Sequence, residues 1–208
     1  MVLCDMTLKD FAEITSQDVA VPGGGSVAAL SASLGASLIE MVGHMSVRKA
    51  TKNKTPLDKD IKDGIKEAAK AKTQLIELID KDAQSFDCVM AAFALPKNTD
   101  AEKEKRGKAI QKAYIGAMQP PLKVINIAFS LLKYGEAMVK KGDPNALSDA
   151  AVGVRMLNSG IWGAIYNVRI NLAGIKDNNE VTRVATEMRE MEKKTEEISR
   201  RILKDLIF

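Results

Sequence analysis

Apolar side chains recur at intervals of three and four residues through most of the chain, which is the period of α-helices. The pattern predicts long helices over approximately residues 8–16, 25–49, 56–93, 100–118, 120–139, 149–173 and 180–202. No convincing strand pattern, repeat or low-complexity tract separates them. The sequence therefore predicts an all-α fold, an antiparallel bundle of long helices that forms a single domain over residues 1–208.

Residue types at the helix starts support these boundaries. Thr7 and Thr99 are suited to cap the helices that follow them, because a threonine side chain accepts a hydrogen bond from the first helical turn. Thr55 followed by Pro56 predicts the start of the third helix, with proline at its first position. Ser148-Asp149 is expected to cap the sixth helix.

Two apolar surfaces predict that the bundle associates. Small residues four apart in the second helix allow another helix to approach closely: Ala28, Ala32, Ala36 and, on the adjacent row, Ser31 and Gly35. In the last helix, apolar residues from Val181 to Ile202 form a narrow seam like that of a coiled coil. Together they supply more apolar surface than one thin bundle should leave exposed, so we expect a homodimer.

A glycine loop stands before the second helix and gives the chain its most distinctive stretch. Pro22, Gly23, Gly24, Gly25 and Ser26 follow one another there. Glycines leave backbone N–H groups open at the positive end of the helix dipole, which is a natural cradle for a carboxylate or phosphate. A tight turn followed by close helix packing explains the same residues. The loop is no phosphate-binding P-loop or dinucleotide fingerprint, because it lacks Gly-Lys-Ser/Thr and follows no strand pattern.

Asp82 is polar where the third helix should be apolar. It lies three residues after Ile79 and four before Phe86, on the stripe predicted to be buried. A buried carboxylate needs a cation or several hydrogen-bond donors, because its desolvation otherwise costs several kcal/mol. Asp82 is therefore a candidate for chemistry, and a structural carboxylate that caps a helix or pairs with a lysine is the alternative.

The helix that begins near Asp149 combines glycines with carboxamides. Gly163 continues the row of Asn167 and Asn171, which lie four residues apart on one face. A surface cleared by glycine and edged by carboxamides suits a flat heterocycle, because each amide offers a donor and an acceptor. Hydrogen bonding between helices is the alternative. Lys97, after the proline that ends the third helix, is a candidate to hold an anion or simply a solvated loop residue.

Composition excludes several other classes of protein. The 208 residues carry a net charge of only +4, with 4% aromatics and no basic-aromatic cluster, so nucleic acid is not expected. Cys4, Cys88 and the single His44 are too few and too scattered for a zinc site or a disulfide scaffold. No metal site is predicted.

A membrane protein is also not expected. The 21 residues from Val19 to Ile39 are uncharged, but the proline and glycines break this stretch, and Glu40, His44 and Arg48 soon follow it. The pattern favours a buried helix of a soluble protein. The first residues do not show the charged and apolar regions of a secretory signal, so a cytoplasmic protein is expected.

Several motifs together resemble one family. They are the run Val21–Ala29, Met41-Val42-Gly43, Asp80-Lys81-Asp82-Ala83 with Phe86, Leu95–Thr99, Ser148-Asp149, and Ile161–Leu172. In this order, across nearly the whole chain, they resemble the cyclodeaminase domain of formiminotransferase-cyclodeaminase, a family that includes stand-alone bacterial methenyltetrahydrofolate cyclohydrolases. The resemblance implies an all-α bundle, a homodimer, and a tetrahydrofolate derivative as substrate, with no cofactor besides it.

The resemblance also implies roles for the candidate residues. Methenyltetrahydrofolate is a delocalised cation, and its hydrolysis passes through a tetrahedral carbon between two nitrogens. Asp82 and Asp149, expected to face a common cleft, would stabilise the cation or move a proton. Asn167 and Asn171 would hold the edge of the pterin ring. Lys97 and the 22–26 loop would hold the anionic glutamate tail.

Three functions are compatible with this sequence. A methenyltetrahydrofolate cyclohydrolase is the first, and it is favoured because a formiminotransferase half is absent from the sequence, although a separate chain can supply that step. A formiminotetrahydrofolate cyclodeaminase, which closes the methenyl bridge and releases ammonia, is the second. A non-catalytic helical dimerisation module is the third, but such a module does not need Asp82 on an apolar stripe.

Overall fold

The computed structural model describes residues 2–204 and 206, and this part of the chain is all-helical, with no strand. The helices are η1 (Leu3–Asp5), α1 (Leu8–Thr15), α2 (Gly24–Asn53), α3 (Lys59–Phe93), α4 (Asp100–Ala117), α5 (Gln119–Lys141), η2 (Pro144–Ala146), α6 (Leu147–Leu172) and α7 (Asn178–Leu203). Each helix predicted from the sequence is present, with ends that differ by a few residues.

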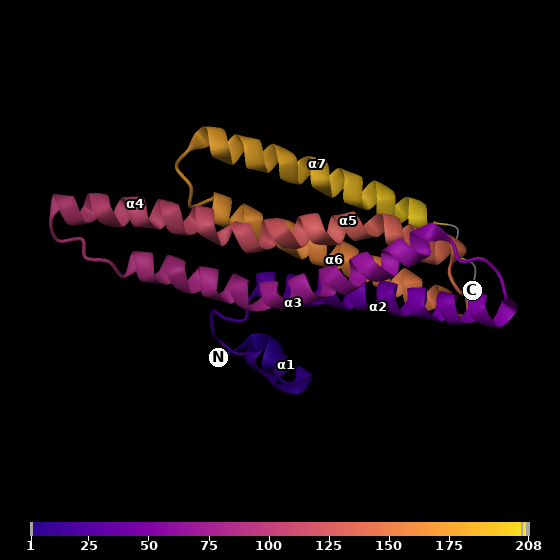
Figure 1. The fold of residues 1–208 in the computed structure, drawn as a ribbon. Coiled ribbons are helices and arrows are strands. Elements are labelled where there is room, and N and C mark those ends of the chain that lie inside the picture. Colours follow the sequence, from indigo (N-terminus) through magenta and orange to yellow (C-terminus); the bar gives the residue numbers. More distant parts are fainter. Residues whose placement is uncertain (1, 205, 207–208) are drawn as a thin grey trace.

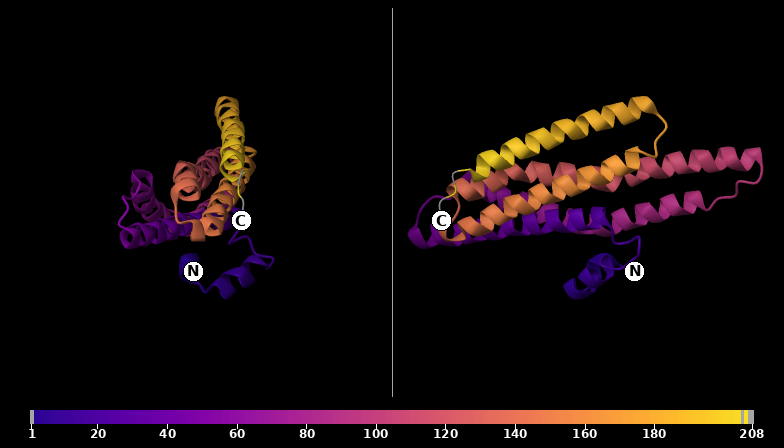
Figure 2. Two further views of the ribbon diagram at one scale, coloured as in Figure 1. Left: turned by 90° about the vertical axis from the view of Figure 1, so that its right-hand side faces the viewer. Right: turned by 180° about the vertical axis from the view of Figure 1, so that it is seen from behind.

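Four long helices, α2, α3, α5 and α6, form an elongated bundle in which consecutive helices run in opposite directions (Figure 1). α4 leads into α5 through Met118 and continues in the same direction, so that it lies beside the C-terminal part of α3. α7 lies along the outside of α5 and α6, while α1 stands off the bundle near the start of α2 (Figure 2). The predicted antiparallel bundle is confirmed.

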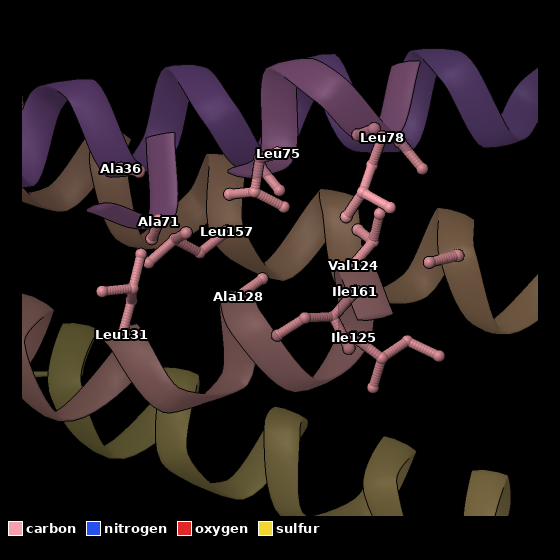
Figure 3. Close-up of a cluster of buried hydrophobic side chains, with 14 of the residues drawn as sticks. Ala36, Ala71, Leu75, Leu78, Val124, Ile125, Ala128, Leu131, Leu157 and Ile161 are labelled. Atoms are coloured by element: carbon pink, nitrogen blue, oxygen red, sulfur yellow. The ribbon is translucent and has the colours of Figure 1, made fainter. Parts of the chain in front are cut away.

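The core of the bundle is aliphatic, as its low aromatic content predicts. Figure 3 shows the central layer, where side chains from all four bundle helices meet: Ala36, Ala71, Leu75, Leu78, Val124, Ile125, Ala128, Leu131, Leu157 and Ile161. All are buried. Burial of such side chains is the main stabilising term for a bundle of this kind.

The small-residue stripe of α2 is used within the chain. A Cβ added at Gly160 of α6 would lie 2.7 Å from the Cβ of Ala32, and one at Gly35 would lie 2.8 Å from the backbone N of Leu157. The Ser31 hydroxyl donates to the carbonyl of Met156 at 3.0 Å. α2 and α6 are thus in backbone-to-backbone contact, and this stripe is not available to a second chain.

The apolar seam of α7 is also covered by its own chain. Val184, Met188 and Ile202 are buried, and α7 packs against α5 and α6. Neither surface that predicted a dimer from the sequence is therefore exposed, and the expectation of a homodimer needs another basis.

Two of the four predicted caps are correct. The side chain of Thr7 accepts from the N–H of Asp10, and Thr99 forms a capping box with Glu102. α3, however, begins after Asp58, whose carboxylate accepts from the N–H of Asp60 at 2.8 Å, so the start at Pro56 was wrong.

The predicted cap of α6 was wrong as well. Asp143 caps the short η2 turn, which leads directly into the helix. α6 therefore begins at Leu147 without a side-chain cap, and Ser148 and Asp149 lie in its first turn.

Two helical stretches, Gly24–Asn53 and Asp100–Lys141, are long and apolar enough to cross a membrane by length and composition alone. Half or more of the most apolar window of each, 56% and 50%, is buried inside the bundle. Core helices of soluble proteins have the same properties.

Candidate active site

A cavity of about 560 Å³ lies at the end of the bundle where α2 begins and α6 ends. It is enclosed by the glycine loop, the C-terminal part of α3, α4 and the last turns of α6. The lining residues are Ala20, Val21, Gly23, Asp82, Ala83, Ser85, Phe86, Val89, Met90, Phe93, Tyr114, Ala117, Asn167, Ile170, Asn171, Ala173 and Gly174. Its size and mainly apolar lining, with a few polar groups, are typical of sites for small organic ligands.

The glycine loop and Asp82 meet at the first turn of α2. A Cβ at Gly25 would overlap the Asp82 carboxylate, so glycine is required there for the carboxylate to reach the helix end. The Ser26 hydroxyl lies 3.4 Å from Oδ2 of Asp82 and donates to the carbonyl of Ile79 at 2.9 Å. The predicted anion cradle exists, but the anion in it is the chain's own carboxylate.

This finding corrects the predicted role of the loop. Pro22 and Ser26 are buried, and Gly25 packs on Asp82, so these three do not line the cavity. Gly23 does line it. A Cβ at Gly24 would lie 3.2 Å from Nδ2 of Asn167, so Gly24 lets the asparagine approach α2 closely. The glycines therefore position the polar groups of the cavity more than they contact a ligand.

Asp82 has no cationic partner. Among the residues that the structure describes, no Lys, Arg or His lines the cavity. Burial raises the pKa of the Asp82 carboxyl above its ordinary value of 3.8, and hydrogen bonding from the Ser26 hydroxyl and backbone N–H partly opposes this rise. Such a carboxyl both accepts and returns a proton more readily near neutral pH than an exposed aspartate does. The alternative of a lysine-paired carboxylate is thereby wrong, whereas the alternative of a carboxylate that caps a helix is correct, because Asp82 accepts from the backbone N–H of Ser26 in the first turn of α2.

Asn167 and Asn171 both line the cavity, as their spacing predicts. Nδ2 of Asn167 donates to the carbonyl of Gly163 at 2.8 Å, and Nδ2 of Asn171 to that of Asn167 at 2.9 Å. A longer bond of 3.4 Å joins Asn171 to Ala117 on α4. No described residue donates to either Oδ1 atom, so both asparagines present acceptors to a ligand.

An aromatic wall of the cavity was missed in the sequence. Phe86 and Phe93 of α3 and Tyr114 of α4 line the cavity, with Phe93 and Tyr114 edge to face at a centroid distance of 6.1 Å. The sequence pattern placed Phe86, Met90 and Phe93 in the core, yet all three are exposed. The apolar stripe of α3 continues beyond the level at which α2 begins, so α2 does not cover the residues past that level. This mismatch is the signal that could have identified the aromatic wall.

Asp149 does not lie at this cavity within one chain. It precedes Asn167 by 18 positions on the continuous helix α6, which is about 27 Å at 1.5 Å per residue. The prediction that Asp82 and Asp149 face a common cleft is therefore wrong for a single copy of the chain.

Lys97 lies beside the cavity in a separate hollow of about 360 Å³. Lys103, Arg106 and Lys176 also line this hollow, and no described carboxylate does. The Arg106 guanidinium stands over the Phe93 ring at 5.4 Å, and Gln111 donates to the carbonyl of Gly174 at 2.9 Å. Phe93 and Gly174 line the cavity, whereas Arg106 and Gln111 line the hollow, so the basic hollow and the cavity share a wall.

Among the described residues, the site combines a half-buried carboxylate without a cationic partner, two carboxamide acceptors and an aromatic wall at one end of an all-helical bundle, which defines a candidate enzyme site for a small organic ligand. The formiminotransferase-cyclodeaminase family profile matches residues 7–190. The chain belongs to this family, as the motifs of the sequence indicated.

Relatives of known activity fall into two groups. The methenyltetrahydrofolate cyclohydrolase of Methylorubrum extorquens is 33% identical over 171 residues, which cover 82% of this chain and 81% of that protein. The formimidoyltransferase-cyclodeaminase of Rattus norvegicus is 36% identical over 176 residues, which cover 85% of this chain. The matched region is only 32% of the rat protein, so this chain spans about a third of that relative.

A solved structure has the same fold. The crystal structure of formiminotetrahydrofolate cyclodeaminase from Thermotoga maritima matches with a TM-score of 0.80 over 96% of this chain and 95% of that one. The two sequences are 24% identical in this superposition.

Proposed function

We propose that this chain is a methenyltetrahydrofolate cyclohydrolase, an enzyme of folate one-carbon metabolism that hydrolyses the methenyl bridge to formyltetrahydrofolate. The observation that carries the proposal is the cation-free cavity around Asp82. A lone carboxylate in an apolar cavity is costly unless a cation neutralises it. The methenyl substrate is such a cation, and the cyclohydrolase relative matches along most of both chains.

The chemistry assigns distinct tasks to the residues of the cavity. Water adds to the bridging carbon, and the Asp82 carboxylate accepts the proton that the water loses as the carbon–oxygen bond forms. One carbon–nitrogen bond then breaks as the added hydroxyl loses its second proton and becomes the formyl carbonyl. The freed nitrogen takes one proton, so of the two protons that leave the water one is kept on nitrogen and one is released. Oδ1 of Asn167 and of Asn171 accepts from the amide edge of the pterin, and the aromatic wall supports the flat ring.

The anionic tail of the substrate extends toward the basic hollow. Lys97, Lys103, Arg106 and Lys176 line that hollow, which adjoins the ring cavity across Phe93. Cations there attract the glutamate carboxylates without neutralising Asp82. In this proposal Lys97 keeps its predicted role, whereas the 22–26 loop acts through Asp82 and Asn167.

A formiminotetrahydrofolate cyclodeaminase is the second candidate. It is favoured by the four vertebrate formimidoyltransferase-cyclodeaminases, which are 33–39% identical to this chain over 76–85% of its length. Its reaction closes the same bridge and uses the same cavity. The dimerisation module is not retained, because the curated relatives carry enzyme names.

One assay separates the two activities. Purified protein is mixed with methenyltetrahydrofolate, whose absorbance falls on hydrolysis, and separately with formiminotetrahydrofolate while ammonia is measured. We expect catalysed loss of methenyl absorbance without ammonia release from the second substrate. Ammonia release from formiminotetrahydrofolate would establish the cyclodeaminase instead, and no turnover of either substrate would reject both proposals. We also propose a homodimer, because the family resemblance implies one. A mass of only 22.6 kDa in solution at micromolar concentration would contradict it.

A further inference from the structure

The turn that joins α6 to α7 contributes to both parts of the candidate site. Gly174 lines the cavity, and Lys176, two positions later, lines the basic hollow. Ile175 between them is buried, so the turn is anchored to the core between these two positions. In Figure 1 this connection lies beside α4, which supplies residues to both the cavity and the hollow. A shift of the turn would therefore change the cavity and the hollow together.

Gln111 of α4 holds this turn with both ends of its carboxamide. Its Nε2 donates to the carbonyl of Gly174 at 2.9 Å, and its Oε1 accepts from the backbone N–H of Lys176 at 2.7 Å. One donor and one acceptor of the same planar group thus bind backbone atoms two residues apart, which fixes the turn in position and in orientation. An ionised glutamate has the same shape but cannot donate to the carbonyl, so the pair of bonds is specific to glutamine.

Tyr114 and Ala117 hold the end of α6 from the same helix. A Cβ at Gly174 would overlap the Tyr114 ring, so glycine lets the ring lie directly on the backbone of the turn. Nδ2 of Asn171 donates to the carbonyl of Ala117 at 3.4 Å, and the carbonyl of Asn171 accepts from the N–H of Gly174 at 3.1 Å. Gln111, Tyr114 and Ala117 follow one another at intervals of three residues on α4, as neighbours on a helix surface do. One helix therefore holds both the carboxamide that lines the cavity and the cation of the turn that lines the hollow.

We propose that Gln111 is a positioning residue for folate binding. It fixes the distance between Asn171 in the cavity and Lys176 in the hollow, so that the ring and the anionic tail of one substrate molecule bind together. This inference rests on the proposed function for the identity of the ligand. Once the ring is bound, the tail binds intramolecularly, and the gain in affinity depends on a fixed spacing of the two sites. A turn that is ordered before the ligand arrives also removes an entropic cost from binding.

A purely structural glutamine would have different consequences. It would stabilise the packing of α4 on the end of α6, and its loss would lower Tm without altering what Lys176 contributes to binding. A positioning glutamine makes the contribution of Lys176 depend on Gln111. Energetic coupling between these two side chains therefore separates the two roles, whereas neither single change does so.

A double-mutant cycle on binding tests the coupling. The dissociation constant of tetrahydrofolate is measured by titration calorimetry for the wild type, Gln111→Leu, Lys176→Ala and the double variant. Lys176→Ala alone should weaken binding by about two- to fivefold, the range of an exposed ion pair. Gln111→Leu should weaken it by about tenfold, because both the fixed spacing and the tail contact are lost. Lys176→Ala should then have no further effect in the Gln111→Leu protein.

The same substitution elsewhere provides the matched control. Gln119→Leu, an exposed change at the start of α5 outside the cavity and the hollow, should bind tetrahydrofolate like the wild type. Gln111→Glu keeps the shape of the side chain and its acceptor but, when ionised, cannot donate to Gly174. It should weaken binding as Gln111→Leu does, and it serves as the second variant if Gln111→Leu does not fold.

Kinetics give a second measure of the same role. Gln111→Leu should raise KM for methenyltetrahydrofolate by about tenfold and leave kcat within about twofold, because Asp82 stands on α3 and keeps its contacts with Ser26. Additive effects of the two changes on binding, or a lower Tm with an unchanged dissociation constant, would overturn the inference and leave the proposed function intact. If the wild type does not bind tetrahydrofolate, the proposed function is rejected and the inference with it.

Discussion

Asp82 and Asp143 lie at opposite ends of the bundle, and their surroundings are opposite too. Asp143 is buried, accepts from the N–H of Asn145 at 3.1 Å and pairs with Lys49 at 3.1 Å. These contacts, the backbone hydrogen bond first, lower the pKa of its carboxyl. Among the residues that the structure describes, Asp82 has no cationic partner, and burial raises the pKa of its carboxyl. The fold gives Asp143 a cation, whereas it gives Asp82 only hydrogen bonds from Ser26.

The comparison shows how to separate a structural acid from a functional one in the same helical bundle. Burial alone does not distinguish them, since both side chains are largely removed from solvent. The difference is whether the chain supplies the compensating charge. A half-buried acid that faces a cavity and lacks a cation is a candidate for chemistry, because perturbed pKa values of such groups are typical of functional sites.

The largest effect is expected at Asp82. Asp82→Asn removes the proton acceptor and the negative charge with little change in shape, so turnover of methenyltetrahydrofolate should fall by on the order of a hundredfold or more. Circular dichroism should show unchanged helicity. Asp87→Asn, an exposed change on the same helix, is the matched control and should keep wild-type turnover. Near-normal turnover of Asp82→Asn would show that Asp82 is not a functional acid, and the contrast with Asp143 would no longer hold.

The glycine that admits Asp82 should be the next most sensitive position. A Cβ at Gly25 overlaps the Asp82 carboxylate, so Gly25→Ala should displace it and reduce kcat by about tenfold or more. Gly116→Ala on α4 is the control, because no atom lies within 4 Å of its added Cβ and Gly116 lines neither the cavity nor the hollow. Equal losses of kcat in Gly25→Ala and Gly116→Ala would contradict a specific role for Gly25.

Thermal stability should distinguish the two acids with opposite signs. The pKa of Asp143 is lowered, so its stabilisation is present above the ordinary value of 3.8 and is lost as pH falls through the folded-state pKa. Asp143→Asn should therefore lower Tm at pH 7, and the deficit should shrink in acid. The pKa of Asp82 is raised, so stability falls as pH rises from 3.8 through its folded-state pKa.

It follows that Asp82→Asn should leave Tm at pH 7 unchanged or slightly higher. Thermal unfolding of both variants at a series of pH values, with the wild type beside them, is the measurement. A lower Tm for Asp82→Asn at pH 7 would mean that Asp82 is a second structural acid.

The smallest effect is expected at Lys97, which provides charge near the cavity but outside it. Lys97→Ala should raise KM by about two- to fivefold, the range of an exposed ion pair, and leave kcat unchanged. Added salt should reduce the difference. Lys105→Ala, on α4 but outside the hollow, is the control. A change in kcat at Lys97 would place a cation nearer to the reacting carbon than the structure does.

The sequence was sufficient for the helices and for part of the site. Periodicity predicted each helix, and two polar anomalies, Asp82 on an apolar stripe and the Asn167–Asn171 pair, both line the cavity. These predictions succeeded because a polar residue at a position expected to be buried breaks the local hydrophobic pattern. Such a break can be read from the sequence alone.

The features of the site that could not be predicted from the sequence depend on the relative lengths of the helices and on how far they are shifted along one another. Phe86 and Phe93 fit a core stripe, and only the position where α2 begins exposes them. Asp149 matches a motif, but its distance from Asp82 follows from the antiparallel course of α6. The group that the glycine loop contacts could not be predicted either, because Gly25 and Asp82 meet only through the packing of α2 on α3.

The hairpin of α3 and α4 extends beyond the four-helix core, and we call this extension the overhang. Because of it, the two parts of the site differ in local stability. Gly24, Asp82 and Asn167 stand where α2 and α6 are locked together by glycine contacts, whereas Phe93 and Tyr114 stand on a helical hairpin with no core beneath its tip. Segments with few buried neighbours open most often, and their amide hydrogens exchange fastest. Amides of the hairpin should therefore exchange before those of α2 and become protected when folate binds, so that the ligand itself supplies the missing core of the overhang.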